Sequence, residues 1–181
     1  MEKKENLLDK KRFYLILGPP NSGKTSLIYR LYSGIFYEEI QVIHRDIEEV
    51  KVDQVHLRAL NIWENNLTHE VWELSATDCR GLIFIIDVSL QTSIKEGKEF
   101  FLDIVQSSYS FQKVPKVVFG NKVDLSSYSE TILLEDLELS SNQNDYFIQC
   151  ISCKTTEGIL EGMAWLMEKA NLFFYIPKFR K

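Results

Sequence analysis

Short apolar runs recur along the chain and are separated by amphipathic stretches and turn residues. Runs that are apolar almost throughout are typical of strands buried on both faces, and strict alternation of apolar and polar residues is typical of half-buried strands. On this basis we predict strands over residues 13–17, 56–63, 81–88, 114–119 and 146–151. Pro115 is placed at the entry of its strand, because proline donates no hydrogen bond to a sheet.

Other segments carry apolar residues at helical spacing. We predict helices over residues 24–32, 92–107, 131–139 and 158–172. The alternation of strands and helices indicates β-α-β units, and therefore a mostly parallel sheet that is covered on both faces. Ligands of such sheets bind in the loops that follow the carboxyl ends of the strands, so candidate binding residues should fall there.

The loop after the first predicted strand has the pattern of a phosphate-binding loop. Residues 18–25 read G-P-P-N-S-G-K-T and fit G-x-x-x-x-G-K-[ST] between a strand and a helix. Glycine lets backbone N–H groups turn toward a phosphate, while Lys24 would reach β- and γ-phosphate oxygens and the Thr25 hydroxyl would ligate Mg²⁺. The alternative is an ordinary strand-to-helix turn, which needs neither Lys24 nor Thr25. The loop alone does not distinguish ATP from GTP, and its candidate binding residues are Gly18, Asn21, Ser22, Gly23, Lys24, Thr25 and Ser26.

A second motif, N-K-V-D, follows the strand predicted at 114–119. The Asp124 carboxylate would accept hydrogen bonds from the N1–H and N2–H₂ edge of guanine, which adenine lacks, so it discriminates between the two bases. The stem of Lys122 would lie over the base, and Asn121 would join the two loops. A four-residue match also fits a surface loop, but its place after the phosphate loop favours guanine. After the next predicted strand the chain reads S-C-K, and the backbone N–H groups of Ser152, Cys153 and Lys154 would face guanine O6.

These motifs resemble those of the Ras-like small GTPases, in which S-A-K is commonest where this chain has S-C-K. Flanking stretches resemble the ADP-ribosylation-factor (Arf) and Arf-like branch: K-T-S-L-I-Y-R-L at 24–31, G-L-I-F-I-I-D at 81–87, V-F-G-N-K-V-D-L at 118–125 and G-I-L-E-G-M-A-W-L at 158–166. The resemblance runs from about Phe13 to Phe173. It implies an α/β P-loop NTPase domain of three layers, with a mostly parallel six-stranded sheet and helices on both faces. It also implies GTP or GDP and Mg²⁺ as ligands.

The same resemblance implies a regulatory switch or adaptor, of a kind that usually serves membrane traffic, cilia or the cytoskeleton. Effector or regulatory proteins would contact the segment from Gly34 to Asp46 and the loop from Glu64 to Arg80. The expected organisation is a G domain over residues 13–176, a charged tail over 1–12 and a basic tail over 177–181. The beta subunit of the signal-recognition-particle receptor is a related possibility, although that protein normally carries a membrane anchor.

Two segments that sense the γ-phosphate in this family differ here. An ungapped alignment puts Val42 where the family has a Thr that holds Mg²⁺, and no Ser or Thr adjoins it. Residues 63–68 read W-E-N-N-L-T in place of W-D-x-G-G-Q. Glu64 therefore replaces the Asp behind the metal, Leu67 replaces a glycine, and no Gln orients the attacking water.

These changes predict weak or absent intrinsic hydrolysis. The catalytic residues are unknown, with Glu64 and His69 as candidates; Glu64 is also a candidate Mg²⁺ ligand beside Thr25, and solvation of His69 is the alternative. Two functions stay open: a GTPase that an activating protein assists, and a pseudo-GTPase scaffold that stays loaded with nucleotide. A P-loop nucleotide kinase would instead carry lid arginines and no N-K-x-D motif.

The composition bears mainly on partners and compartment. A net charge of −5 argues against a nucleic-acid-binding protein, and 45% hydrophobic residues suit a single globular domain. The C-x-x-C of Cys150 and Cys153 has no second pair for zinc, which favours reduced thiols. Glu2 stands where myristoylation needs Gly, and the last residues hold no Cys for prenylation, so no lipid anchor is expected. We expect a cytoplasmic monomer with at most peripheral contact to an internal membrane.

Overall fold

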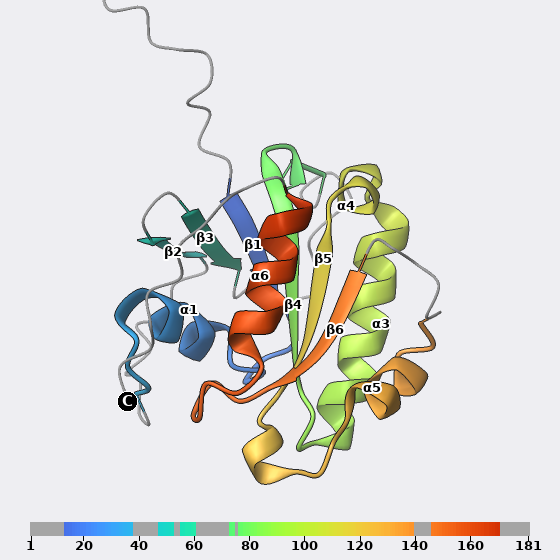
Figure 1. Ribbon diagram of the computed structural model, residues 1–181. Helices are drawn as coiled ribbons and strands as arrows, with labels where there is room; N and C mark the ends of the chain where they lie inside the picture. Colours follow the sequence, from blue (N-terminus) through green and yellow to red (C-terminus); the bar gives the residue numbers. More distant parts are fainter. Residues whose placement is uncertain are drawn as a thin grey trace, which may run out of the picture.

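The computed structural model describes residues 13–37, 47–52, 55–60, 73–74, 76–139 and 146–170. These residues form a six-stranded sheet in the order β2-β3-β1-β4-β5-β6 (Figure 1). The strands are β1 (Phe13–Leu17), β2 (Ile47–Val52), β3 (Val55–Leu60), β4 (Cys79–Asp87), β5 (Lys116–Asn121) and β6 (Tyr146–Ile151). Neighbouring strands are parallel except for β2 and β3, which are antiparallel. The predicted sheet is confirmed.

Helices cover both faces of this sheet. They are α1 (Lys24–Ser33), α3 (Gln91–Ser107), α4 (Tyr109–Lys113), α5 (Glu130–Asp136) and α6 (Ile159–Lys169), with a 3₁₀ turn η1 (Val123–Leu125). The first and last helices, α1 and α6, pack on one face, and α3, α4 and α5 pack on the other. β1 feeds both cores because successive strand side chains alternate: Tyr14 and Ile16 join the first core, and Phe13, Leu15 and Leu17 join the second. The three-layer α/β fold is confirmed.

The strand β2 is one that the apolar pattern did not predict. It lies at the edge of the sheet and pairs with β3 alone among the described strands. Its sequence, I-E-E-V-K-V, alternates between more and less exposed side chains and carries charge on an edge, a common defence against pairing with other chains. A half-exposed edge strand of this kind has no continuous apolar run by which to recognise it.

The observed boundaries differ from the predicted ones by a few residues. β5 begins at Lys116 because Pro115 has no N–H, and it continues through Asn121, so that the strand carries the first residue of N-K-x-D into the interior. The residues that follow β3 in the predicted strand lie outside the described ranges, as do those beyond 170 in the last predicted helix. The short helix α4 was not predicted; the Ser108 hydroxyl caps it by accepting from the Phe111 N–H at 3.2 Å.

Over the described ranges, none of the helices is both long and apolar enough to cross a membrane.

Candidate nucleotide-binding site

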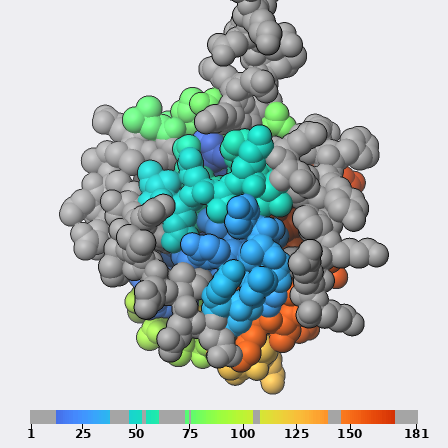
Figure 2. Space-filling model, turned by 90° about the vertical axis from the view of Figure 1, so that its left-hand side faces the viewer, coloured from blue at the N-terminus to red at the C-terminus, as the bar shows by residue number. Residues whose placement is uncertain are grey.

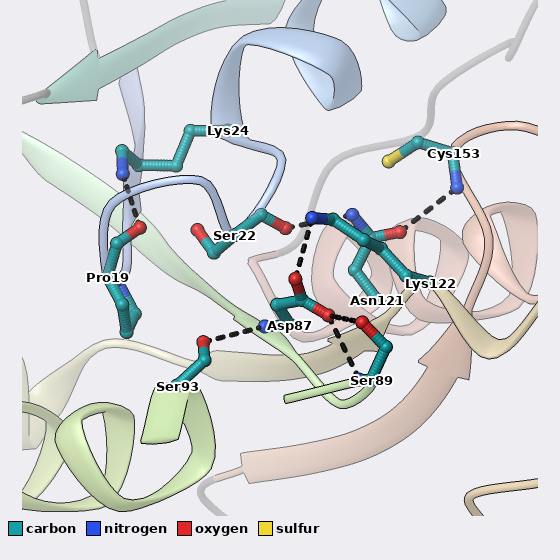
Figure 3. A network of polar contacts seen from close by, with 9 residues as sticks. All are labelled: Pro19, Ser22, Lys24, Asp87, Ser89, Ser93, Asn121, Lys122 and Cys153. Carbon is teal, nitrogen blue, oxygen red and sulfur yellow. Dashed lines mark hydrogen bonds and ion pairs between the residues drawn. The ribbon is translucent and has the colours of Figure 1, made fainter. Parts of the chain in front are cut away.

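The loops after β1, β4, β5 and β6 meet at one edge of the sheet (Figure 3), because the carboxyl ends of parallel strands lie together. The phosphate-loop pattern lies after β1, N-K-x-D begins at the end of β5, and S-C-K follows β6. The two loops that carry these last motifs are adjacent because β5 and β6 pair, with Asn121 beside Ile151. Sequence motifs that lie far apart in the chain therefore form one candidate site.

Close backbone approach explains the glycines of the phosphate loop. A Cβ on Gly18 would lie 2.0 Å from the Ile85 carbonyl oxygen, and one on Gly23 would lie 2.2 Å from Asn121 Nδ2. Their φ angles of 151° and 105° are also ones that residues with a Cβ rarely adopt. The loop is thus pressed against β4 and Asn121. Pro19 and Pro20 have no N–H, so the continuous run of backbone donors begins at Asn21.

Lys24 reaches back under this loop. Its Nζ donates to the carbonyl oxygens of Gly18 at 2.9 Å and Pro19 at 2.8 Å, and its side chain is buried. Burial lowers the pKa of Lys24 to about 8, an effect that the carboxylate of Glu48 opposes. Among the described residues its acceptors are these two neutral carbonyls, and a desolvated ammonium bound in this way gains strongly from a phosphate placed beside it. The loop therefore has the electrostatics of an anion site.

Glu48 is a residue of this site that the sequence did not reveal. The Thr25 hydroxyl donates to Glu48 Oε1 at 3.0 Å, which brings a carboxylate from β2 to the first turn of α1, where Ser26 also lies. A hydroxyl and a carboxylate are oxygen ligands of the type that Mg²⁺ takes, with phosphate oxygens and water completing its coordination. Residues present at the predicted position of the metal thus fit Mg²⁺.

Asn121 joins the phosphate loop to the S-C-K loop. Its Nδ2 donates to the Ser22 carbonyl at 2.8 Å, and its Oδ1 accepts from the Cys153 N–H at 3.1 Å. The side chain is buried, so both amide groups are held by protein partners away from water. Asn121 thus joins the phosphate loop to the S-C-K loop, while its part in binding a nucleotide stays a prediction.

The carboxylate of Asp124 is exposed, in the η1 turn, and is oriented by a neighbour. Ser152 donates its hydroxyl to Asp124 Oδ1 at 2.6 Å and accepts from the Thr155 N–H at 3.1 Å. A charge-assisted bond of this kind restrains the orientation of a carboxylate. Asp124 is therefore presented to solvent in a restrained orientation, as a base-reading acceptor would require.

Lys122 is anchored by a second residue that the sequence analysis missed, Asp87 (Figure 3). Lys122 Nζ lies 2.6 Å from Asp87 Oδ2, while Asp87 Oδ1 accepts from the N–H and hydroxyl of Ser89. Asp87 is almost fully buried, at 1% exposure, yet both of its oxygens are paired. The clue in the sequence was a carboxylate at the end of an apolar run. This ion pair holds the stem of Lys122 beside the loop that carries Asp124.

The structure does not describe three positions that the sequence analysis linked to switching, metal binding or catalysis: Val42, Glu64 and His69. Their expected roles are therefore untested. Cys150 and Cys153 are buried, and burial raises the pKa of each thiol to about 12, which disfavours the thiolate that zinc binds. Within the described part of the chain, no group of three or more His, Cys, Asp and Glu side chains is placed to hold a metal.

The parallel sheet, the phosphate loop and the neighbouring base-reading loop define the chain as a P-loop domain of the small-GTPase type. The family model described as "ADP-ribosylation factor family" matches residues 1–170, and the chain belongs to that family of GTP-binding regulators.

Curated relatives agree with this assignment. The chain is 26% identical over 154 residues to ADP-ribosylation factor 3 of Arabidopsis thaliana, with 84% of each chain covered. It is 27% identical over 166 residues to ADP-ribosylation factor-related protein 1 of Rattus norvegicus, covering 85% of this chain and 82% of the relative. Since the matches extend over most of each chain, the similarity concerns the whole domain.

We predict that the affinity for GDP falls as the pH rises through about 8, because the pKa of Lys24 in the free protein is about 8. Phosphate raises that pKa on binding, so Lys24 is already charged below this pH and must take up a proton above it. Titration calorimetry at pH 7 and pH 8.5, in buffers of different ionisation enthalpy, measures both quantities. Lys24→Arg, whose guanidinium stays charged, should abolish the proton uptake; uptake that persists in this variant would assign it to another group.

We predict that Glu48→Gln raises the Mg²⁺ concentration needed for half-maximal GDP retention by about ten- to a hundredfold, since one polar interaction with a charged group is worth about 1.5–3 kcal/mol. Glu49→Gln is the matched control, because Glu49 is the next residue of β2, faces the other way and pairs with Arg58. Release of a fluorescent GDP analogue over a Mg²⁺ series measures the effect. Tighter retention in Glu48→Gln would show that this carboxylate opposes the nucleotide.

Proposed function

We propose that this chain binds GDP and GTP, with Mg²⁺, and acts as an Arf-like regulatory switch or adaptor in intracellular membrane traffic, with weak or absent intrinsic hydrolysis. The observation that carries the proposal is the Asn121 bridge between the phosphate loop and the S-C-K loop, to which Asp124 is also bonded. A single ligand with a phosphate chain at one end and a hydrogen-bonding base at the other would contact both the phosphate loop and the S-C-K loop.

Guanine is the base that this arrangement favours. Asp124 is an exposed, oriented carboxylate that needs hydrogen-bond donors, and the edge of guanine offers an N1–H and an N2–H₂. Adenine presents no such pair of donors, so it would leave the acceptor unsatisfied. Lys122, held by Asp87, would place its aliphatic stem against the face of the base.

Thr25 and Glu48 would hold the metal. Bound Mg²⁺ supplies charge neutralisation between the phosphate groups, which is its usual contribution in nucleotide sites. The Thr25 hydroxyl would turn its oxygen lone pairs to the ion, while the carboxylate of Glu48, now within 3.0 Å of that hydroxyl, would bind the ion directly or through water. Lys24 would neutralise the phosphate oxygens from the other side of the loop.

Weak hydrolysis is proposed from the sequence departures at Val42, Glu64 and Leu67. Accessory groups that orient water and stabilise charge supply on the order of 10³–10⁵ of the rate in GTPases of this type. Without the water-orienting Gln, the intrinsic reaction of this chain should be slower still. Glu64 and His69 are the candidates for a substitute role. The same departures support the second candidate function, an interaction scaffold that stays loaded with nucleotide.

A surface beside the site supports binding of effector or regulatory proteins. Tyr32, Ile35 and Tyr37, at the end of α1 and just beyond it, are exposed, and the rings of Tyr29 and Tyr37 are in edge contact at 5.7 Å. Figure 2 looks onto this face, where the blue of α1 and of the residues after it adjoins the teal of β2 and β3. Exposed aromatic side chains are enriched in protein interfaces. We propose this face, together with the segment from Gly34 to Asp46 and the loop from Glu64 to Arg80, as the partner-binding surface.

The proposed setting is the cytoplasm, with at most peripheral contact to an internal membrane, and the chain is proposed to act there as a monomer. This rests on the family and on the cysteines: Cys150 and Cys153 are free thiols with raised pKa values. A relationship to the beta subunit of the signal-recognition-particle receptor would imply a different membrane task for the same nucleotide chemistry.

The nucleotide content of purified protein and its single-turnover GTPase rate test the proposal together. We expect bound guanine nucleotide on denaturation, and an intrinsic rate below about 10⁻⁴ s⁻¹ at saturating Mg²⁺, slower than the slow intrinsic rate of Ras. Bound GTP would favour the scaffold, and bound GDP with slow turnover the regulated GTPase. Bound adenine nucleotide, or GTP turnover at the rate of ordinary small GTPases or faster, would contradict the proposal.

A further inference from the structure

A buried arginine near the end of α1 lies behind the base-reading loop and has no role in the site described so far. Arg30 is 6% exposed. Its Nε donates to the Cys153 carbonyl at 2.9 Å and its Nη2 to the Lys154 carbonyl at 2.5 Å. The guanidinium therefore binds two consecutive peptides of a loop that lies more than a hundred residues away along the chain.

The same guanidinium also binds the segment that follows α1. Its Nη1 donates to the Gly34 carbonyl at 2.8 Å, and the ring of Phe36 lies 5.7 Å from its Cζ. Gly34 caps α1 with a φ of 72° and is the first residue of the proposed partner-binding segment. One planar cation thus ties the S-C-K loop to the end of α1.

The direction of the Cys153 and Lys154 carbonyls determines where the N–H groups of the S-C-K loop point, and these are the groups that would face the base. In a planar trans peptide the C=O of one residue points opposite to the N–H of the next. Because the Cys153 carbonyl points at Arg30, the Lys154 N–H points away from α1, and the Lys154 carbonyl fixes the Thr155 N–H in the same way. The Thr155 N–H donates to the Ser152 hydroxyl, which in turn donates to Asp124. Arg30 therefore sets the orientation of the loop that would face guanine O6.

Asn121 holds only the other side of this loop, through the Cys153 N–H. Arginine suits the task because it presents several donors in a rigid plane, whereas lysine presents one compact charge. Removal of Arg30 would leave the buried Cys153 carbonyl and the partly buried Lys154 carbonyl without this donor, and the loop would turn them toward water.

We propose that Arg30 is a positioning residue for guanine recognition: it holds the S-C-K loop in the conformation that accepts the base and links that loop to Gly34. The inference rests on the proposed guanine-nucleotide function and adds to it a residue outside the phosphate loop and the N-K-x-D and S-C-K motifs. If Arg30 has this role, its replacement should weaken the binding of ligands that carry the base and leave the binding of phosphates alone unchanged.

Titration calorimetry of the full chain with GDP and with inorganic pyrophosphate, both with Mg²⁺, tests this. Arg30→Met should lower GDP affinity at least tenfold and change pyrophosphate affinity less than twofold. Arg30→Lys should give a smaller loss of the same kind. Lys116→Met is the matched control, since Lys116 is also buried and its Nζ also donates to three carbonyls, those of Phe111, Gln112 and Val114, away from the site. It should lower the melting temperature without changing either affinity.

An unchanged ratio of GDP to pyrophosphate affinity in a folded Arg30→Met protein would overturn the proposal, whether both affinities stay the same or both fall equally. If Arg30→Met does not fold, the same ratio in Arg30→Lys decides the question. Wild-type protein that binds pyrophosphate but not GDP would instead refute the guanine-nucleotide function itself, so the two failures are distinguishable.

Discussion

The site depends on the buried side chain of Asn121. An amide has both a donor and an acceptor, and here each is used once, on the phosphate loop and on the loop after β6. The close fit around this side chain excludes a Cβ at Gly23, which would meet Nδ2 at 2.2 Å. Because Asn121 ends a fully buried strand, it cannot move without disturbing the sheet. The spacing between the phosphate loop and the S-C-K loop is thereby fixed by the fold.

The charged groups around Asn121 differ in how they are compensated. Asp87 and Lys122 neutralise each other at 2.6 Å, whereas Asp124 is bonded to the neutral hydroxyl of Ser152. Among the described residues, neutral carbonyls bind the buried ammonium of Lys24, and the carboxylate that raises its pKa is that of Glu48. The described part of the site thus lacks a strong anion beside Lys24, and a nucleotide phosphate chain would supply it. Asp124, in contrast, is an exposed acceptor that already binds the Ser152 hydroxyl through Oδ1.

Much of this could be predicted from sequence because it is local. A buried parallel strand is an uninterrupted apolar run, and the phosphate loop and N-K-x-D are contiguous residues whose chemistry is readable from their order. What could not be predicted depends on the third dimension. Glu48 reaches Thr25 because edge strand β2 lies beside α1. In the sequence Arg30 is one polar position in an amphipathic helix, and its bond to Cys153 is known only once the fold places the loop after β6 beside α1. Strand β2 itself has too little apolar character to stand out.

Small GTPases usually combine two abilities, nucleotide binding and switching, and we propose that they are separated in this chain. The motif residues proposed to hold a guanine nucleotide are joined by hydrogen bonds of Asn121, while the residues that sense the γ-phosphate in the family are replaced at Val42, Glu64 and Leu67. Binding can persist without efficient switching, because contacts to the base and to the β-phosphate do not depend on the third phosphate.

The most direct test is the preference of the protein for GDP over ADP, measured by titration calorimetry in wild type and in Asp124→Asn. Asp78→Asn, an exposed carboxylate just before β4 and so at the opposite end of the sheet, is the matched control. We predict a preference for GDP of at least a hundredfold, on the order of the roughly 3 kcal/mol that one unsatisfied charged acceptor costs. This preference should be lost in Asp124→Asn and kept in Asp78→Asn. Equal affinities for GDP and ADP in the wild type, or a preference that survives Asp124→Asn, would contradict this prediction.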